Sequence, residues 1–152
     1  MKLIEASYRI GNIAWSQATS FEIVGSWVTS ESNANAKLQF FSQALRQGRH
    51  AKSLVALLPK IADLSPEDFL LPESSKVSEL FDGLRGLVTT QERLTGLYLE
   101  LMPMNLISLR NFLADSKPIS DMPFIRQVAE VLADEEQDLG SGLSLLAGQK
   151  PR

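Results

Sequence analysis

The residues best able to do chemistry in this sequence are polar side chains that interrupt otherwise apolar helical stripes. Each stripe is a set of positions three or four residues apart, which share one face of an α-helix. The polar positions on these faces are Gln17, Gln47, His50, Asn105, Glu135 and Asp138. Burying a polar group costs roughly 1–3 kcal/mol unless it is hydrogen-bonded. We therefore expect these side chains to contact one another, or a bound metal, in the protein interior.

A metal site is one interpretation of this pattern. His50, Glu135 and Asp138 form a set of one imidazole and two carboxylates, which suits iron, manganese or zinc if the helices bring them together. The three other positions offer only neutral amides, whereas two divalent irons need anionic oxygen ligands. A di-iron centre is therefore not expected.

A hydrogen-bonded network without metal is the second interpretation, and the one we favour. In this network Glu135 pairs with His50, and the amides satisfy the donors and acceptors that remain. It requires no cofactor, whereas the first interpretation requires iron, manganese or zinc.

Glu22 and Glu100 are rival ligands. At 100° per residue, Glu22 lies about 140° from Gln17 and Glu100 lies about 100° from Leu101. Both carboxylates are therefore expected on helix edges or exposed faces. They would reach the interior only if the helices were rotated from this assignment. The same helical positions direct Arg46 away from the polar face of its helix and place Asp134 on a solvated face.

Several other chemistries are excluded by what the sequence lacks. It contains no cysteine, so disulfides, thiol nucleophiles and cysteine-based metal sites are ruled out. With His50 as the single histidine, a Ser-His-Asp arrangement would need a nucleophile elbow, and none is present. The sequence also contains no P-loop and no G-x-G-x-x-G motif.

Four long helices are expected to carry the polar residues. The apolar repeats predict helices over 7–28, 36–58, 89–114 and 123–147. The turn at 30–35 joins the first two and offers N-cap residues, and Pro59 ends the second helix. The capping box formed by Thr89 and Glu92 begins the third helix, which Pro103 should kink.

The connection between the second and third predicted helices is long. Ser65 followed by Pro66 is typical of the start of a short helix, and 75–88 is predicted to form another. The segment is long enough to traverse a bundle, so we expect two helical hairpins joined by one long crossover. Because no segment shows the alternation typical of strands, the fold class predicted is all-α.

The chain resembles ferritin-like four-helix-bundle proteins of actinobacterial type. Di-iron bundles place one Glu on each of two helices and a Glu-x-x-His motif on each of the other two. Gln47-Gly48-Arg49-His50 is similar to that motif with Gln in place of Glu, and Glu135-Glu136-Gln137-Asp138 with Asp in place of His. Further likeness lies in FEIVGSWV, QGRHAKSLVALLP, RLTGLYLELMP and VLADEEQDL.

This resemblance implies one ferritin-like domain over residues 1–152, with a degenerate di-iron site. Gln17 would take one of the single-ligand positions, and Leu101 or Asn105 the other. The fold and the loss of most ligands together favour a non-catalytic structural or interaction subunit. The alternative is a metal-dependent oxidoreductase or oxygenase with a reduced ligand set.

Composition limits the partners. The net charge is −3 and no run of like charges occurs, so neither a nucleic-acid partner nor a membrane partner is expected. No apolar stretch of about 18 residues is present, and the N-terminus is unlike a signal peptide. A cytoplasmic location is the resulting expectation.

Self-association is expected from apolar residues that turn away from the polar faces. They are Leu38, Phe41 and Leu45 on the second helix and Leu99 and Leu106 on the third. The crossover helix can cover only one of these two surfaces. An uncovered apolar patch favours a homodimer, and a different protein partner is also possible.

Overall fold

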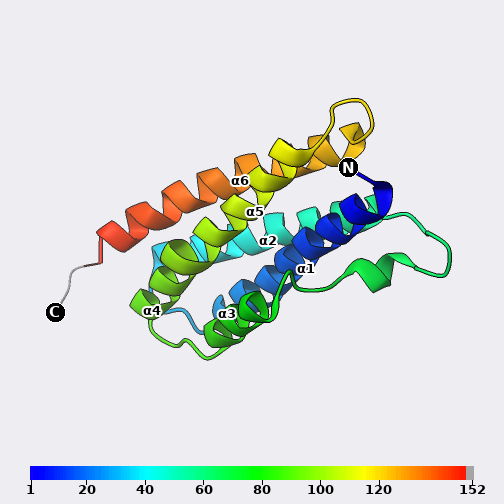
Figure 1. The fold of residues 1–152 in the computed structure, drawn as a ribbon. Helices are drawn as coiled ribbons and strands as arrows, with labels where there is room; N and C mark the ends of the chain where they lie inside the picture. Colours follow the sequence, from blue (N-terminus) through cyan, green and yellow to red (C-terminus); the bar gives the residue numbers. More distant parts are fainter. Residues whose placement is uncertain (150–152) are drawn as a thin grey trace.

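The computed structural model describes residues 1–149, and in that range it is all-helical, which confirms the all-α part of the prediction (Figure 1). The α-helices are α1 (Leu3–Trp27), α2 (Ala34–Leu57), α3 (Ser75–Arg85), α4 (Thr90–Thr95), α5 (Met102–Asp115) and α6 (Met122–Ala147). A 3₁₀ helix (Pro66–Phe69) lies in the crossover, and a π-helical segment (Gly96–Leu101) joins α4 to α5. The four long helical runs are therefore α1, α2, the continuous run from α4 to α5, and α6.

The predicted capping residues begin these helices. The Asn33 side chain accepts a hydrogen bond from the Ala36 backbone N–H at the start of α2. Thr89 accepts a hydrogen bond from the Glu92 backbone N–H at the start of α4. Such side-chain acceptors satisfy backbone donors that the first turn leaves free, so the helix starts are fixed locally.

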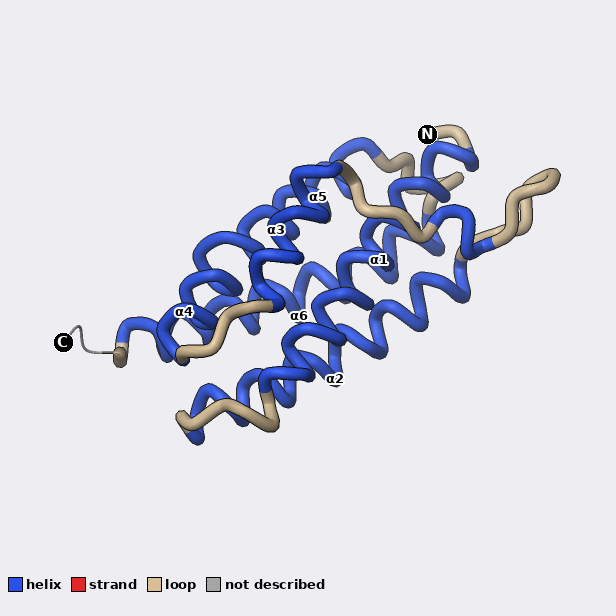
Figure 2. The backbone as a smooth tube through the Cα atoms, turned by 90° about the horizontal axis from the view of Figure 1, so that it is seen from below, coloured by secondary structure: helices blue, strands red, loops and turns tan. Residues whose placement is uncertain are grey.

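The long helices form two hairpins joined by the crossover. α1 packs against α2, α5 packs against α6, and contacts of α2 with α6 and of α1 with α5 link the two hairpins. Figure 1 shows the chain leaving α2 at one end of the molecule and returning along its length to α4 at the other end. In the crossover, α3 packs against α1 and the π-helical segment (Figure 2).

The crossover approaches α1 closely at Gly11. A Cβ atom at this position would lie only 1.9 Å from the backbone oxygen of Phe69. The Phe69 side chain is fully buried, and its ring meets Tyr8 edge-on at a centroid distance of 4.9 Å. Gly11 therefore lets the crossover backbone lie directly on α1.

The hydrophobic core consists of two clusters, one toward each end of the helices. One includes Trp27, Phe40, Phe81, Leu97 and Tyr98. The other includes Ile10, Leu54, Phe69, Phe112 and Val128. On the long helices, the polar positions predicted from the sequence fall between these clusters, so a polar layer separates two apolar ends.

The third long helical run is irregular in the turn before Pro103. The sequence predicts a kink at Pro103, whereas the structure widens the preceding turn into the π-helical segment. Proline has no N–H and its ring crowds the carbonyl four residues earlier, so a widened turn relieves the conflict. The wider turn also changes the register of the residues that follow.

This change of register corrects one surface prediction. Leu99 is 52% exposed, as expected, but Leu106 is only 3% exposed and belongs to the core. Seven residues apart, the two would share a face in a regular helix, but the π-helical segment lies between them. On α2, the predicted outward positions Leu38, Phe41 and Leu45 are all exposed.

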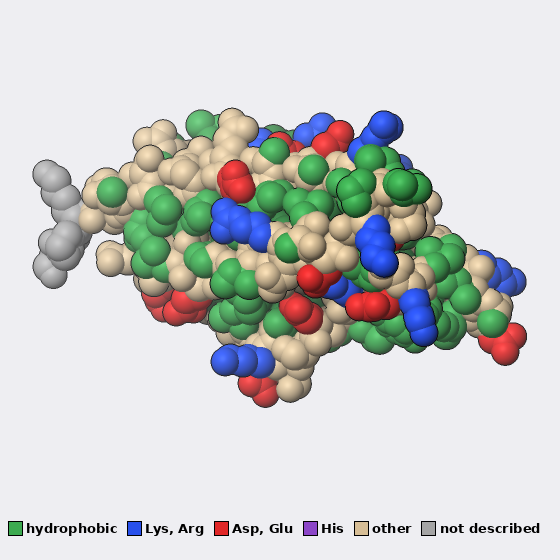
Figure 3. All heavy atoms as spheres, turned by 45° about the horizontal axis from the view of Figure 1, so that its top comes forward, with side chains coloured by type: hydrophobic (Ala, Val, Ile, Leu, Met, Phe, Trp, Pro, Cys, Tyr) green, Lys and Arg blue, Asp and Glu red, His purple; other side chains and the backbone are tan. Residues whose placement is uncertain are grey.

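Charged side chains of both signs are interspersed with hydrophobic ones on the face shown in Figure 3. This agrees with the scattered charges of the sequence. Within residues 1–149, no helix combines the length and the apolar character needed to cross a membrane.

Candidate functional site

The centre of the polar layer is the carboxyl group of Glu135 on α6, which is 2% exposed. Its Oε1 accepts a hydrogen bond from Gln17 Nε2 at 3.0 Å and a longer one from Gln47 Nε2 at 3.4 Å. The two amides come from α1 and α2 and are also buried. The structure thus brings together three of the residues singled out from the sequence.

Hydrogen-bond donors are in short supply around this carboxyl group. Glu135 Oε2, Gln17 Oε1 and Gln47 Oε1 are all buried, and none has a partner within residues 1–149. Burial raises the pKa of Glu135 to about 7, against the opposing effect of the two amide hydrogen bonds. A proton on Glu135 supplies one donor to a cluster that otherwise holds three unpartnered acceptors, so the neutral acid suits this environment.

Asp138, one turn further along α6, lies beside Arg46 of α2. Arg46 Nε donates to Oδ2 at 3.2 Å, and the Arg46 terminal nitrogen contacts Oδ1. Gln39 Nε2 also donates to Oδ1, at 3.1 Å. The expectation that Arg46 points away from the polar face is therefore wrong, because its long side chain reaches from the edge of α2 to the carboxylate. This contact raises the pKa of Arg46.

His50 pairs with Asp134 rather than with Glu135. His50 Nε2 lies 2.6 Å from Asp134 Oδ2, so the predicted Glu135–His50 pair is wrong. One residue along α6 turns the side chain by about 100°, which directs Asp134 toward the flank of α2 where His50 lies. Asp134 was expected on a solvated face, but its side chain is only 37% exposed.

The candidate metal ligands do not converge on one point. His50, Glu135 and Asp138 each have a different partner, and among residues 1–149 no group of three His, Asp or Glu side chains is placed to hold a metal. The amide N–H groups directed at Glu135 would also repel a cation at Oε1. This donor set therefore does not fit a metal of the ferritin kind.

The rival ligands lie outside the site. Glu22 is exposed and pairs with Arg85 at 2.8 Å, and Glu100 is exposed on the π-helical segment. These positions agree with the edge or surface placement expected from the helical wheel.

The network extends beyond the residues that were predicted to form it. Tyr98 donates to Gln43 Oε1 at 2.7 Å, and Gln43 Nε2 contacts Met102 Sδ at 3.3 Å. Gln39 and Gln43 precede Gln47 on α2 at intervals of one helical turn. This glutamine stripe was the signal available in the sequence, because residues four apart share a helix face.

Asn105 does not join the Glu135 cluster. Its side chain is 6% exposed, and Nδ2 is buried without a partner. It lies instead at a cleft of about 360 Å³ between α1 and α5, which Gln17 also lines. Gln17 therefore belongs to both the polar cluster and the cleft.

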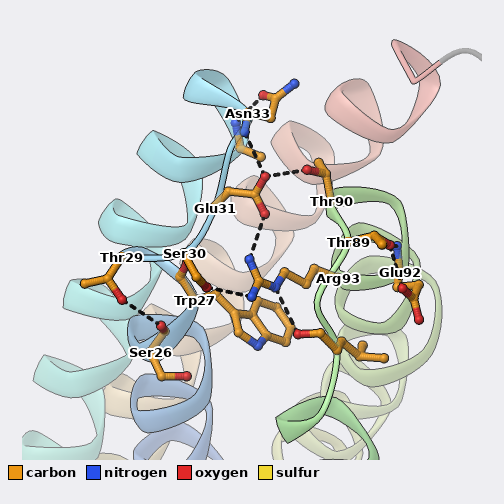
Figure 4. A network of polar contacts seen from close by, with 12 residues as sticks. Ser26, Trp27, Thr29, Ser30, Glu31, Asn33, Thr89, Thr90, Glu92 and Arg93 are labelled. Atoms are coloured by element: carbon orange, nitrogen blue, oxygen red, sulfur yellow. Dashed lines mark hydrogen bonds and ion pairs between the residues drawn. The ribbon is translucent and has the colours of Figure 1, made fainter.

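A second buried polar cluster joins the α1–α2 turn to α4 (Figure 4). Arg93 pairs with Glu31 at 3.1 Å and donates to Ser30 Oγ at 2.7 Å. Its guanidinium lies 5.6 Å from the centre of the Trp27 ring, and Thr90 donates to Glu31. Every charge in this cluster has a partner, so we assign it a structural role.

Comparisons of this chain with protein-family models, curated proteins and solved structures find no match.

Proposed function

We propose that this chain is a ferritin-like four-helix bundle whose metal site has been replaced by a hydrogen-bonded network, and that it acts as a non-catalytic structural or interaction subunit. The observation that carries this proposal is the hydrogen bonding of Glu135. Two amide nitrogens donate to the same carboxyl oxygen at a position where the resemblance would place a metal ligand.

The contacts of Asp138 support the same proposal. The Arg46 guanidinium pairs with this carboxylate, so the two groups together carry no net charge. A carboxylate paired in this way attracts a metal cation only weakly. The two helical hairpins joined by a long crossover also support it, because the resemblance implies this connectivity. A metal-dependent oxidoreductase with a reduced ligand set has less support, since its three candidate ligands have separate partners.

Metal analysis tests the proposal directly. Protein purified without chelator should carry only substoichiometric iron, manganese or zinc by inductively coupled plasma mass spectrometry. Stoichiometric metal that remains after dialysis would favour the oxidoreductase instead.

Restoring carboxylates tests the degenerate site. The double variant Gln17→Glu/Gln47→Glu places two further acids beside Glu135, so it should be less stable without metal and regain stability with Mn²⁺ or Zn²⁺. Gln137→Glu makes the same chemical change on the exposed face of α6 and is the matched control. If the double variant responds to metal no more than this control, the cluster does not derive from a metal site.

The interaction surface proposed is an apolar stripe on α2. Leu38, Phe41 and Leu45 are 65%, 52% and 49% exposed. Phe21 of α1 is also exposed, and its ring packs on Gly48 of α2, where a Cβ atom would lie 3.0 Å from the ring. Phe21 therefore extends the stripe. Large exposed apolar groups that adjoin one another are typical of protein interfaces, and a homodimer is the simplest closed assembly.

A further inference from the structure

The cleft between α1 and α5 has the size and construction of a small-molecule site. Its volume of about 360 Å³ falls in the range of ligand pockets. Arg9 of α1 pairs with Asp115 of α5 at 2.9 Å, and Ser108 donates to Glu73 of the crossover at 2.9 Å. These two contacts join the elements that line the cleft and hold its walls in place.

The deep part of the cleft combines apolar surface with unused hydrogen-bonding capacity. Ile13, Leu109 and Phe112 are buried residues that line it. Gln17 and Asn105 line it as well, and Gln17 Oε1 and Asn105 Nδ2 are buried without partners. Just beneath the lining of the same cleft there are therefore an acceptor on α1 and a donor on α5 that have no partner within residues 1–149.

Each amide has a defined reason to be available. Gln17 uses its nitrogen on Glu135, which leaves its oxygen to accept. The last torsion of an Asn side chain has a broad energy well, so the Asn105 amide can turn its nitrogen toward a bound molecule. Buried polar groups without partners are uncommon in native proteins, and a ligand is one way to satisfy them.

We propose that this cleft binds a small uncharged molecule with a planar amide edge, such as a primary carboxamide or a lactam. The ligand N–H donates to Gln17 Oε1, and its carbonyl oxygen accepts from Asn105 Nδ2. Its apolar body lies against Ile13, Leu109 and Phe112. This binding role goes beyond the interaction role proposed above and does not depend on it.

The charges around the cleft argue for a neutral ligand. Glu135 lies behind Gln17, and Asp115 and Glu73 lie at the cleft lining, so an anion would meet carboxylates. Arg9 is already paired with Asp115, and its guanidinium lies 5.4 Å from the centre of the Phe112 ring. An anionic group at the buried end would lose its hydration without gaining a counter-charge.

Three small aromatic probes test the proposal on the full chain. Benzamide carries both the donor and the acceptor, acetophenone lacks the donor, and benzoate carries a charge. Titrations followed by ¹⁵N–¹H NMR should give a benzamide Kd of about 1 mM or tighter, as expected for a fragment of this size. Acetophenone and benzoate should bind about tenfold more weakly or not at all, because each leaves a polar group unpaired.

A pair of variants places the binding site. Asn105→Leu should weaken benzamide binding about tenfold. Ser20→Ala is the matched control, because Ser20 Oγ is likewise buried without a partner but lies outside the cleft, and it should leave binding unchanged. If Asn105→Leu does not fold, the side-chain NH₂ signals of Asn105 and Gln17 in the unmodified protein should shift with benzamide.

Three results would overturn the proposal. The first is the absence of saturable benzamide binding up to about 10 mM, a generous limit for a fragment. The second is equal affinity for all three probes. The third is unchanged benzamide affinity in a folded Asn105→Leu variant, or unshifted NH₂ signals where that variant does not fold.

Discussion

Glu135 illustrates how one buried acid can depend on its protonation state for its contribution to stability. Its carboxyl group is 2% exposed and has two amide donors but no cationic partner in the described part of the chain. Burial raises its pKa from 4.5 to about 7. At a pH between these two values, the native state therefore keeps a proton that the unfolded chain has lost. The contribution of Glu135 to stability is therefore greatest below about pH 4.5, and it is lost as the pH rises through about 7.

The first prediction concerns this pH dependence. Between pH 5 and pH 8 the unmodified protein should lose unfolding free energy on the order of 3 kcal/mol. Glu135→Gln cannot ionise at this position, so it should not show this loss. Urea unfolding at both pH values measures it. Glu136→Gln is the control, because Glu136 is exposed and its side chain contacts Arg110 at the surface. Parallel pH profiles for the unmodified protein and Glu135→Gln would show that Glu135 does not carry the effect.

The sequence was sufficient to place Gln17, Gln47 and Glu135 together, because each interrupts the centre of an apolar stripe. It was not sufficient for His50, which lies at the flank of α2. Whether His50 meets Asp134 or Glu135 depends on a rotation of α6 by one residue, about 100°. The periodicity of the sequence does not determine the rotation of a helix this closely. Arg46 was misplaced for a different reason: a helical wheel locates the Cβ atom and not the end of a long side chain.

At the scale of whole elements, local signals identified the helices, while their contacts with one another were harder to predict. The caps at Asn33 and Thr89 were visible in the sequence and are present in the structure. The π-helical segment was not predicted, although Pro103 marked the region as irregular. How a helix accommodates a proline depends on what packs around it, and Tyr98 within that segment packs so closely that a Cβ at Gly142 would lie 2.2 Å from its ring.

The second prediction concerns the cluster that ties the α1–α2 turn to α4 (Figure 4). Arg93→Met should lower the unfolding free energy by about 3 kcal/mol, because it leaves the Glu31 carboxylate buried without its counter-charge. Arg85→Met removes an exposed arginine that pairs with Glu22, and it should cost less than about 1 kcal/mol. Chemical denaturation compares the two. Equal losses would mean that the buried pair contributes no more than a surface pair.

At the scale of the whole molecule, two apolar clusters flank one polar layer. The crossover reaches the core at Phe69 and Phe81, one in each cluster. It therefore contributes to both ends of the interior. It does not cover the stripe on α2, where Phe41 remains 52% exposed, and so this apolar surface is left open by residues 1–149.

The third prediction concerns that surface. If Leu38, Phe41 and Leu45 form a self-complementary interface, sedimentation at micromolar concentration should give a species of twice the 16.8 kDa chain mass. Phe41→Lys places a charge within the stripe and should shift the protein to monomer, because an unpaired charge at an apolar contact loses its hydration. Ile119→Lys is the matched control: Ile119 is 98% exposed in the loop before α6 and is not part of the stripe, so the dimer should persist. A clean monomer for the unmodified chain would contradict self-association and leave a different protein as the partner of this stripe. A dimer that persists in Phe41→Lys would place the interface elsewhere.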